Sequence, residues 1–122
     1  MKLCTDIPVT CKIRTGWSKN EDEAHNLIEK VLETNVAAIT LHGRSRVCRY
    51  TGLARWDYIG QCSQVVRSWR ENDAIRNTAF LGNGDVFHYT GRLKHFYLPF
   101  ASKVTFLSGN FMKFFFLENG DR

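Results

Sequence analysis

Polar residues that could contact a ligand end three apolar runs of the sequence. Lys12 and Arg14 come late in IPVTCKIR, His42 ends ITLH, and FLGNGD ends in Asn83-Gly84-Asp85. A lysine places a positive charge beside an anionic ligand or a developing negative charge. A histidine can donate or accept a hydrogen bond near neutral pH. A glycine-containing turn after a strand can bind phosphate or a ribityl chain.

Each of these residues also has an ordinary structural alternative. Lys12 could simply reach solvent from a strand end, and His42 could be a hydrogen-bonded structural residue. Gly43 favours a binding role for His42, because glycine lets the backbone approach a ligand closely. The 82–85 segment could be a turn only, and it matches neither GxGxxG nor the P-loop.

A basic and aromatic cluster follows His42, and it consists of Arg44, Arg46, Arg49 and Tyr50. Guanidinium groups suit phosphate and RNA, and a tyrosine ring can stack on a base. A solvated loop explains the cluster equally well. The formal net charge of +5 fits a nucleic-acid partner, although many proteins without one share such a charge.

Composition and cysteine spacing exclude several classes of site. The chain has 122 residues, 43% of them hydrophobic, which suits one small globular domain. Its four cysteines form no CxxC and no Cys/His cluster with zinc spacing, so we expect no metal site. No catalytic triad is apparent. We see no signal peptide and no membrane span, and therefore expect reduced thiols and an intracellular protein, cytoplasmic or nuclear.

The hydrophobic pattern alternates between strands and helices. Residues 7–13, 36–41 and 79–81 are predicted strands, and in the second Ala38, Thr40 and His42 share one face. A capping box formed by Ser18 and Glu21 predicts a helix start. The helix ends at Asn35, and its apolar stripe consists of Ala24, Leu27, Ile28, Val31 and Leu32. A second amphipathic helix spans about 54–70 and is predicted to bury Ile59, Cys62 and Val66.

This order predicts an α/β fold with three parallel strands. Right-handed crossovers bring the carboxyl ends of all three strands to one edge, where α/β proteins bind their ligands. Lys12, His42 and the 83–85 segment should therefore converge. Residues 88–122 are rich in phenylalanine without a period of 2 or 3.6, so they are predicted to be a divergent tail.

Three motifs in this order, IPVTCKIRTG, ITLHGRSRVCRYTGLARW and FLGNGD, resemble the middle of tRNA-dihydrouridine synthases, most of all the eukaryotic variable-loop enzymes. The resemblance covers about residues 5–87 and implies a fragment of a TIM (β/α)8 barrel of about three βα units. It implies FMN as cofactor, NADPH as reductant, tRNA as substrate and reduction of uridine to 5,6-dihydrouridine.

The resemblance also implies residue roles. Lys12, His42, Asn83, Gly84 and Asp85 would bind FMN. The arginines at 44, 46 and 49, with Tyr50, would lie on the RNA side of the mouth. The family's proton-donating cysteine belongs to an Asn-x-Gly-Cys-Pro context that does not occur here, so no cysteine is assigned as the acid.

The chain departs from the family pattern in two places. Arg55 stands where an acid usually precedes Trp56, and the resemblance ends after Phe87. We therefore expect residues 1–87 to be a barrel fragment without independent activity. The alternatives are a non-catalytic RNA-binding fragment and a truncated product without function.

Overall fold

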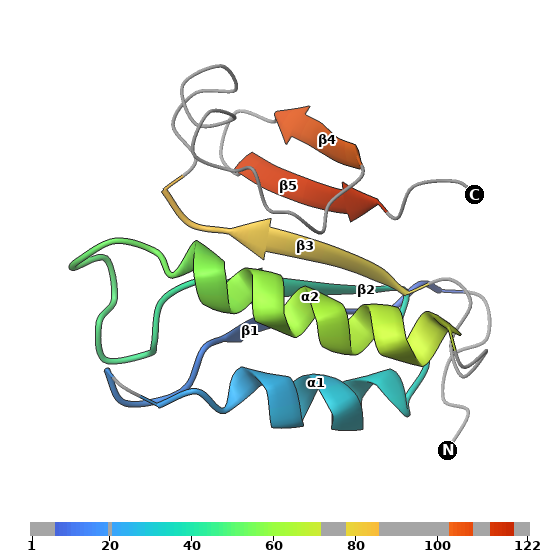
Figure 1. Ribbon diagram of the computed structural model, residues 1–122, viewed down its shortest axis with the longest axis horizontal. Helices are drawn as coiled ribbons and strands as arrows, with labels where there is room; N and C mark the ends of the chain where they lie inside the picture. The colour runs from blue at the N-terminus through green and yellow to red at the C-terminus, as the bar shows by residue number, and fades with distance from the viewer. Residues whose placement is uncertain (1–6, 20, 72–77, 86–102, 109–112, 119–122) are drawn as a thin grey trace.

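The computed structural model describes residues 7–19, 21–71, 78–85, 103–108 and 113–118. In this part of the chain, two helices and five strands form two layers, with both helices on the same face of one sheet (Figure 1). The elements are β1 (Thr10–Arg14), α1 (Ala24–Leu32), β2 (Ala38–His42), α2 (Trp56–Glu71), β3 (Ala79–Asn83), β4 (Lys103–Ser108) and β5 (Lys113–Glu118).

The three predicted parallel strands are confirmed. The sheet has the order β1-β2-β3-β5-β4, in which β1, β2 and β3 pair in parallel. Each of the two parallel connections passes through a helix, and both helices cover one face (Figure 1). The α/β class is therefore correct, and the open sheet is consistent with part of a TIM barrel.

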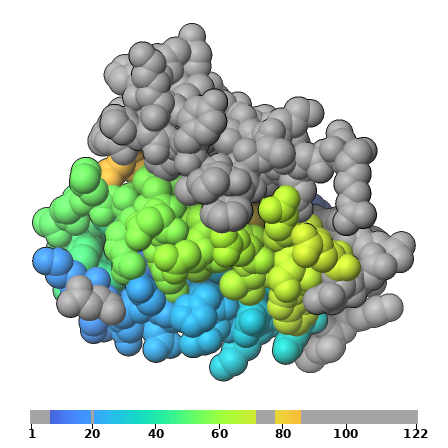
Figure 2. All heavy atoms as spheres, viewed as in Figure 1, coloured from blue at the N-terminus to red at the C-terminus, as the bar shows by residue number. Residues whose placement is uncertain are grey.

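The core lies between the helices and one face of the sheet. Ile39 and Leu41 of β2 are fully buried, and Phe80 of β3 is 2% exposed. The helices add Ile28, Leu32, Ile59, Cys62 and Val66 to the same cluster. Figure 2 shows the side chains of α1 and α2 in contact along their lengths. Strand periodicity therefore directs the alternate residues, including His42, to the opposite face.

The first helix starts later than the capping box predicts. The Glu21 carboxylate accepts hydrogen bonds from the backbone N–H groups of Trp17 and Ser18, at 2.8 and 2.6 Å. These bonds close a turn, and α1 begins only at Ala24. The Thr15 carbonyl accepts from the N–H groups of Glu23 and Ala24. α1 ends at Leu32, three residues before the predicted end, but Asn35 does adopt the predicted left-handed conformation, with a φ of 56°.

Two strands arise in the predicted tail. β5 pairs antiparallel with β4 and with β3, where Leu81 lies opposite Phe116 and Gly82 opposite Phe115. The tail lacks a simple hydrophobic period, and therefore this hairpin could not be predicted from the sequence. The other residues of the 88–122 segment lie outside the described part.

Across all the described residues, no helix is long and apolar enough to cross a membrane.

Candidate functional site

Two rows of side chains cross the sheet on the face opposite the helices. Arg14, His42 and Asn83 are register partners at the carboxyl ends of β1, β2 and β3. One step earlier, Lys12 pairs with Thr40, which pairs with Leu81. Lys12 therefore lies in the middle of β1, whereas the sequence had suggested a position at the end of the strand. It nevertheless shares a face with His42, as a binding role requires.

His42 is buried and its imidazole is incompletely paired. The residue is 5% exposed, and its Nε2 atom has no hydrogen-bond partner among the described residues. Burial lowers the pKa of His42 to about 4, and the positive charges of Arg14, Lys12 and Arg44 act in the same direction. The ring is therefore neutral at pH 7. A buried polar atom without a partner is costly, so this nitrogen is a candidate ligand contact.

Lys12 supplies a positive charge near this ring. Partial burial first, and the charge of Arg14 second, lower the pKa of Lys12. The residue is nevertheless exposed to solvent, so its ammonium group remains charged at neutral pH. A charged ammonium and a neutral imidazole on one face suit a ligand that has both anionic and hydrogen-bonding groups.

The turn after β3 lies directly against the His42 ring. β3 extends through Asn83, so the turn is made by Gly84 and Asp85 and not by the whole predicted 82–85 segment. Gly84 has a φ of +118°, a region that side chains disfavour. A Cβ at this glycine would lie 2.8 Å from His42 Cδ2 and 2.7 Å from Ala54 Cβ. Only a glycine fits this close approach.

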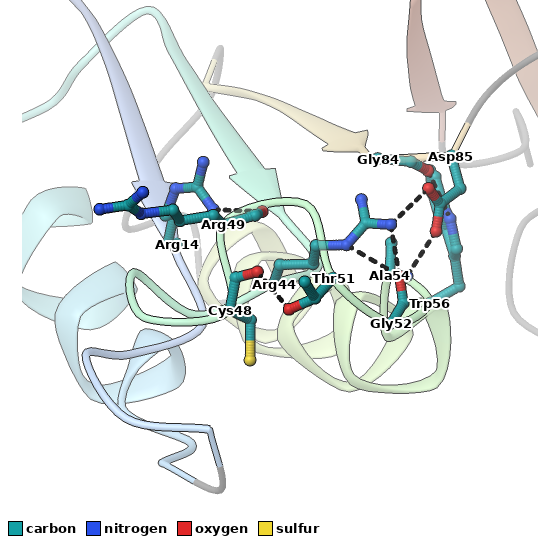
Figure 3. Close-up of polar contacts among 10 residues, drawn as sticks. All are labelled: Arg14, Arg44, Cys48, Arg49, Thr51, Gly52, Ala54, Trp56, Gly84 and Asp85. Carbon is teal, nitrogen blue, oxygen red and sulfur yellow. Dashed lines mark hydrogen bonds and ion pairs between the residues drawn. The ribbon is translucent and has the colours of Figure 1, made fainter.

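Arg44 and Asp85 form a buried ion pair at the same edge (Figure 3). The Arg44 Nη2 atom lies 2.6 Å from Asp85 Oδ1, and the exposed fractions of the side chains are 7% and 8%. Asp85 Oδ2 also accepts from the Ala54 N–H at 2.6 Å. The expectation that Arg44 contacts RNA does not fit this buried position. Likewise, the Asp85 carboxylate already binds groups of the protein itself.

The other residues of the basic and aromatic cluster lie on the surface. Arg46 and Arg49 are exposed, and Tyr50 is 80% exposed. The Arg14 Nη1 atom donates to the carbonyls of Ser45 and Arg49, at 3.1 and 3.3 Å, and so ties this loop to β1. Figure 3 shows the contact with Arg49. The chain therefore presents two arginines and a tyrosine from an anchored loop.

Sequence reasoning did not identify Trp17 as a neighbour of this loop. The indole is 68% exposed, and the Arg46 guanidinium lies 5.9 Å from its ring centroid. The backbone N–H of Val47 donates to the Trp17 carbonyl at 3.0 Å. The sequence offers no spacing signal for this contact, because Trp17 and Arg46 lie on different segments that only the fold brings together.

The described cysteines do not form a reactive or metal-binding group. Cys62 is buried on α2, and burial raises its pKa to about 11. Cys11 and Cys48 are partly exposed, whereas Cys4 lies outside the described residues. In the described part of the chain, no three potential metal ligands cluster.

Comparison with known proteins identifies one family. The family model for dihydrouridine synthase (Dus) matches residues 1–96, and thus reaches beyond Phe87, where the resemblance found in the sequence ends. A tRNA-dihydrouridine(47) synthase [NAD(P)(+)] of Scheffersomyces stipitis is 53% identical over 92 residues, which is 69% of this chain and 15% of that protein.

Relatives with the same name in other yeasts give the same result. The Kluyveromyces lactis protein is 40% identical over 127 residues, covering 98% of this chain and 19% of its own. The Saccharomyces cerevisiae protein is 43% identical over 96 residues, covering 69% of this chain and 14% of its own. The chain thus spans less than a fifth of the length of these relatives.

Proposed function

The chain belongs to the dihydrouridine synthase family, and we propose that it carries one side of the FMN site of an enzyme that reduces uridine to 5,6-dihydrouridine in tRNA. The names of the relatives include NAD(P)(+), which supports NADPH or NADH as the reductant. Because the chain spans so little of those proteins, we propose that it does not catalyse the reaction alone.

The observation that carries this proposal is the unpaired Nε2 of His42. It lies on the sheet face that also presents Lys12, at the carboxyl edge where α/β proteins bind cofactors. An isoalloxazine ring has hydrogen-bonding groups along its edge, and such a group would satisfy this buried nitrogen. The Lys12 ammonium would balance negative charge on the cofactor.

The turn after β3 also fits an FMN molecule. The close approach of Gly84 to His42 leaves backbone, and no side chain, at this position. Asn83 and Gly84 would therefore contact the cofactor at the carboxyl edge of the sheet, whereas Asp85 would support the turn. These residues fit the cofactor that the resemblance implies, with one role reassigned.

The residues of the chain would then perform three tasks. FMN, when bound, supplies the hydride chemistry. Neutral His42 offers one hydrogen bond through Nε2 and so orients the isoalloxazine ring. Lys12 holds a fixed positive charge on the same face of the sheet. Burial of His42 also excludes water from its side of the site. No described cysteine is assigned as the proton donor to the uracil.

Titration of the purified chain with FMN tests this proposal. We expect saturable quenching of flavin fluorescence, weakened about tenfold or more by Lys12→Ala or by His42→Ala. Lys30→Ala is the matched control, because Lys30 lies in the last turn of α1 on the opposite layer. Absence of FMN binding by a folded chain, or equal weakening by the control, would reject the proposed site.

A second candidate function, RNA binding without catalysis, is supported by the exposed loop. Trp17 and Tyr50 present aromatic surfaces, and Arg46 and Arg49 add positive charge beside them. Stacking on aromatic rings, combined with phosphate contacts, is how proteins bind single-stranded RNA.

A salt series with tRNA distinguishes this candidate from a protein that binds no RNA. Binding should weaken linearly on a double-logarithmic salt plot, and the slope should decrease in Arg46→Ala and Arg49→Ala. Arg67→Ala is the control, because Arg67 lies on α2 beside Glu71. An unchanged slope in the loop variants would contradict the assignment of this surface.

A further inference from the structure

We propose that Arg44 and Asp85 are positioning residues, which fix the Gly84 turn against His42 and thereby shape the His42 side of the cofactor site. The identity of the cofactor rests on the function proposed above, but the positioning itself does not. The pair joins two segments that are distant in the sequence, the loop after β2 and the turn after β3 (Figure 3).

Each member of the pair makes more than one contact with the loop after β2. The Arg44 guanidinium donates through Nε and Nη2 to the Gly52 carbonyl, at 3.2 and 2.6 Å, and through Nη2 to Asp85. Asp85 accepts Arg44 on one oxygen and the Ala54 N–H on the other. The two side chains thus hold three points of the β2 loop to the turn.

Backbone and indole contacts extend this connection toward His42. The Gly43 N–H donates to the Asn83 carbonyl at 3.0 Å, and Trp56 Nε1 donates to the Gly84 carbonyl at 2.9 Å. Gly84 is also in tight contact with the His42 ring, so movement of the turn would uncover the ring. The groups whose charges act on His42 are Arg14 and Lys12 from β1, Arg44 from its own loop, and Asp85 from the turn.

The variant Asp85→Asn separates positioning from a simple charge effect. Asparagine keeps the size of the side chain and tolerates the left-handed φ of 55° found here. Its amide offers only one oxygen, so either Arg44 or the Ala54 N–H must lose its acceptor. Loss of the negative charge alone would lower the pKa of His42. Release of the turn would instead raise it, because the ring would become solvated.

The variant Arg44→Lys tests the same idea with the charge retained. A single ammonium group cannot reproduce the forked contacts with Gly52 and Asp85. The Coulomb effect on His42 is then nearly constant, so an increase in its pKa reports positioning alone. This milder change also keeps the test available if Asp85→Asn does not fold.

The chain offers a matched control in a second arginine–aspartate pair. Arg55 and Asp22 also form a bidentate ion pair, but these side chains are 39% and 41% exposed. Asp22→Asn removes the same charge from a surface pair that does not contact the turn. It should leave both the pKa of His42 and the affinity for FMN unchanged.

The experiment records the His42 ring signals by NMR against pH, with assignment by His42→Asn, and then titrates each folded variant with FMN. We expect the pKa of His42 to rise from about 4 toward 6.5 in Asp85→Asn and Arg44→Lys. FMN affinity should fall about tenfold in both. A His42 pKa that stays constant or falls in the folded variants would overturn the proposal. If the unmodified chain binds no FMN, the proposed function fails, and the His42 signals still decide the positioning role.

Discussion

His42 combines deep burial with an imidazole nitrogen that the described residues leave unpaired. Such an arrangement lowers stability unless a ligand completes the hydrogen bond. Proteins keep unfavourable features of this kind mainly at functional sites. The geometry therefore supports the binding role proposed for His42, which its position at the end of an apolar run only suggests.

The burial of His42 predicts a pH dependence of stability. Its pKa is about 4 in the folded chain and near 6.5 when exposed, so the unfolded state binds the proton more strongly between these values. The contribution is complete above pH 6.5 and is lost as the pH falls toward 4. We expect a loss of up to about 3 kcal/mol in the free energy of unfolding.

Urea denaturation at several pH values measures this effect. His42→Asn removes the titrating group, so its stability should depend less on pH between 4 and 6.5 than that of the unmodified chain. The variant His25→Asn provides the comparison. It removes a histidine that is exposed on α1 and hydrogen-bonded to Tyr58. If His42→Asn shows the same pH dependence as the unmodified chain, His42 is not buried as described.

At the level of elements, the hydrophobic periodicity of the sequence predicted many of the helix residues that pack in the core. The three residues predicted to be buried on the second helix, Ile59, Cys62 and Val66, are all in the core. The first helix was less accurate, since Leu27 is 44% exposed although it belongs to the apolar stripe. An apolar stripe identifies the face of a helix, but its edges depend on how the neighbouring helix lies.

Contacts between loops could not be predicted in the same way. The sequence placed Arg44 with the surface arginines because three arginines follow one another closely. Its burial depends on Asp85, which is 41 residues away and reaches it only through the parallel register of β2 and β3. The sequence predicted that these segments converge, and the structure shows which side chains pair there.

The contact between β3 and α2 depends on the absence of a side chain at Gly82. A Cβ added there would lie 2.5 Å from Trp56 Cζ3 and 3.0 Å from Ile59 Cγ2. Gly82→Ala should therefore lower the free energy of unfolding by about 1–3 kcal/mol through overpacking, as measured by urea denaturation.

A double variant tests whether Trp56 causes this loss. Trp56→Phe shortens the ring that meets the new methyl group, although it also removes the N–H that binds the Gly84 carbonyl. If the explanation is correct, Gly82→Ala should cost less in the Trp56→Phe background than alone. Strictly additive losses would place the strain elsewhere.

For the whole molecule, the sheet is covered unevenly. The helices pack on one face (Figure 1), while strand alternation places Lys12 and His42 on the opposite face. β5 adds an antiparallel strand beside β3, at the edge where a further strand of a parallel sheet would pair. An uncovered strand edge offers free N–H and C=O groups to other chains, and β5 occupies part of this edge.

This arrangement predicts that the hairpin limits self-association. A chain that ends at residue 102 lacks β4 and β5, so the edge of β3 is exposed and should pair with other copies. Light scattering should then detect association at lower protein concentrations than for the intact chain. Phe115→Pro provides a full-length comparison, because proline at the register partner of Gly82 cannot donate in the ladder. If both variants remain as dispersed as the intact chain, protection of β3 by β5 does not control association.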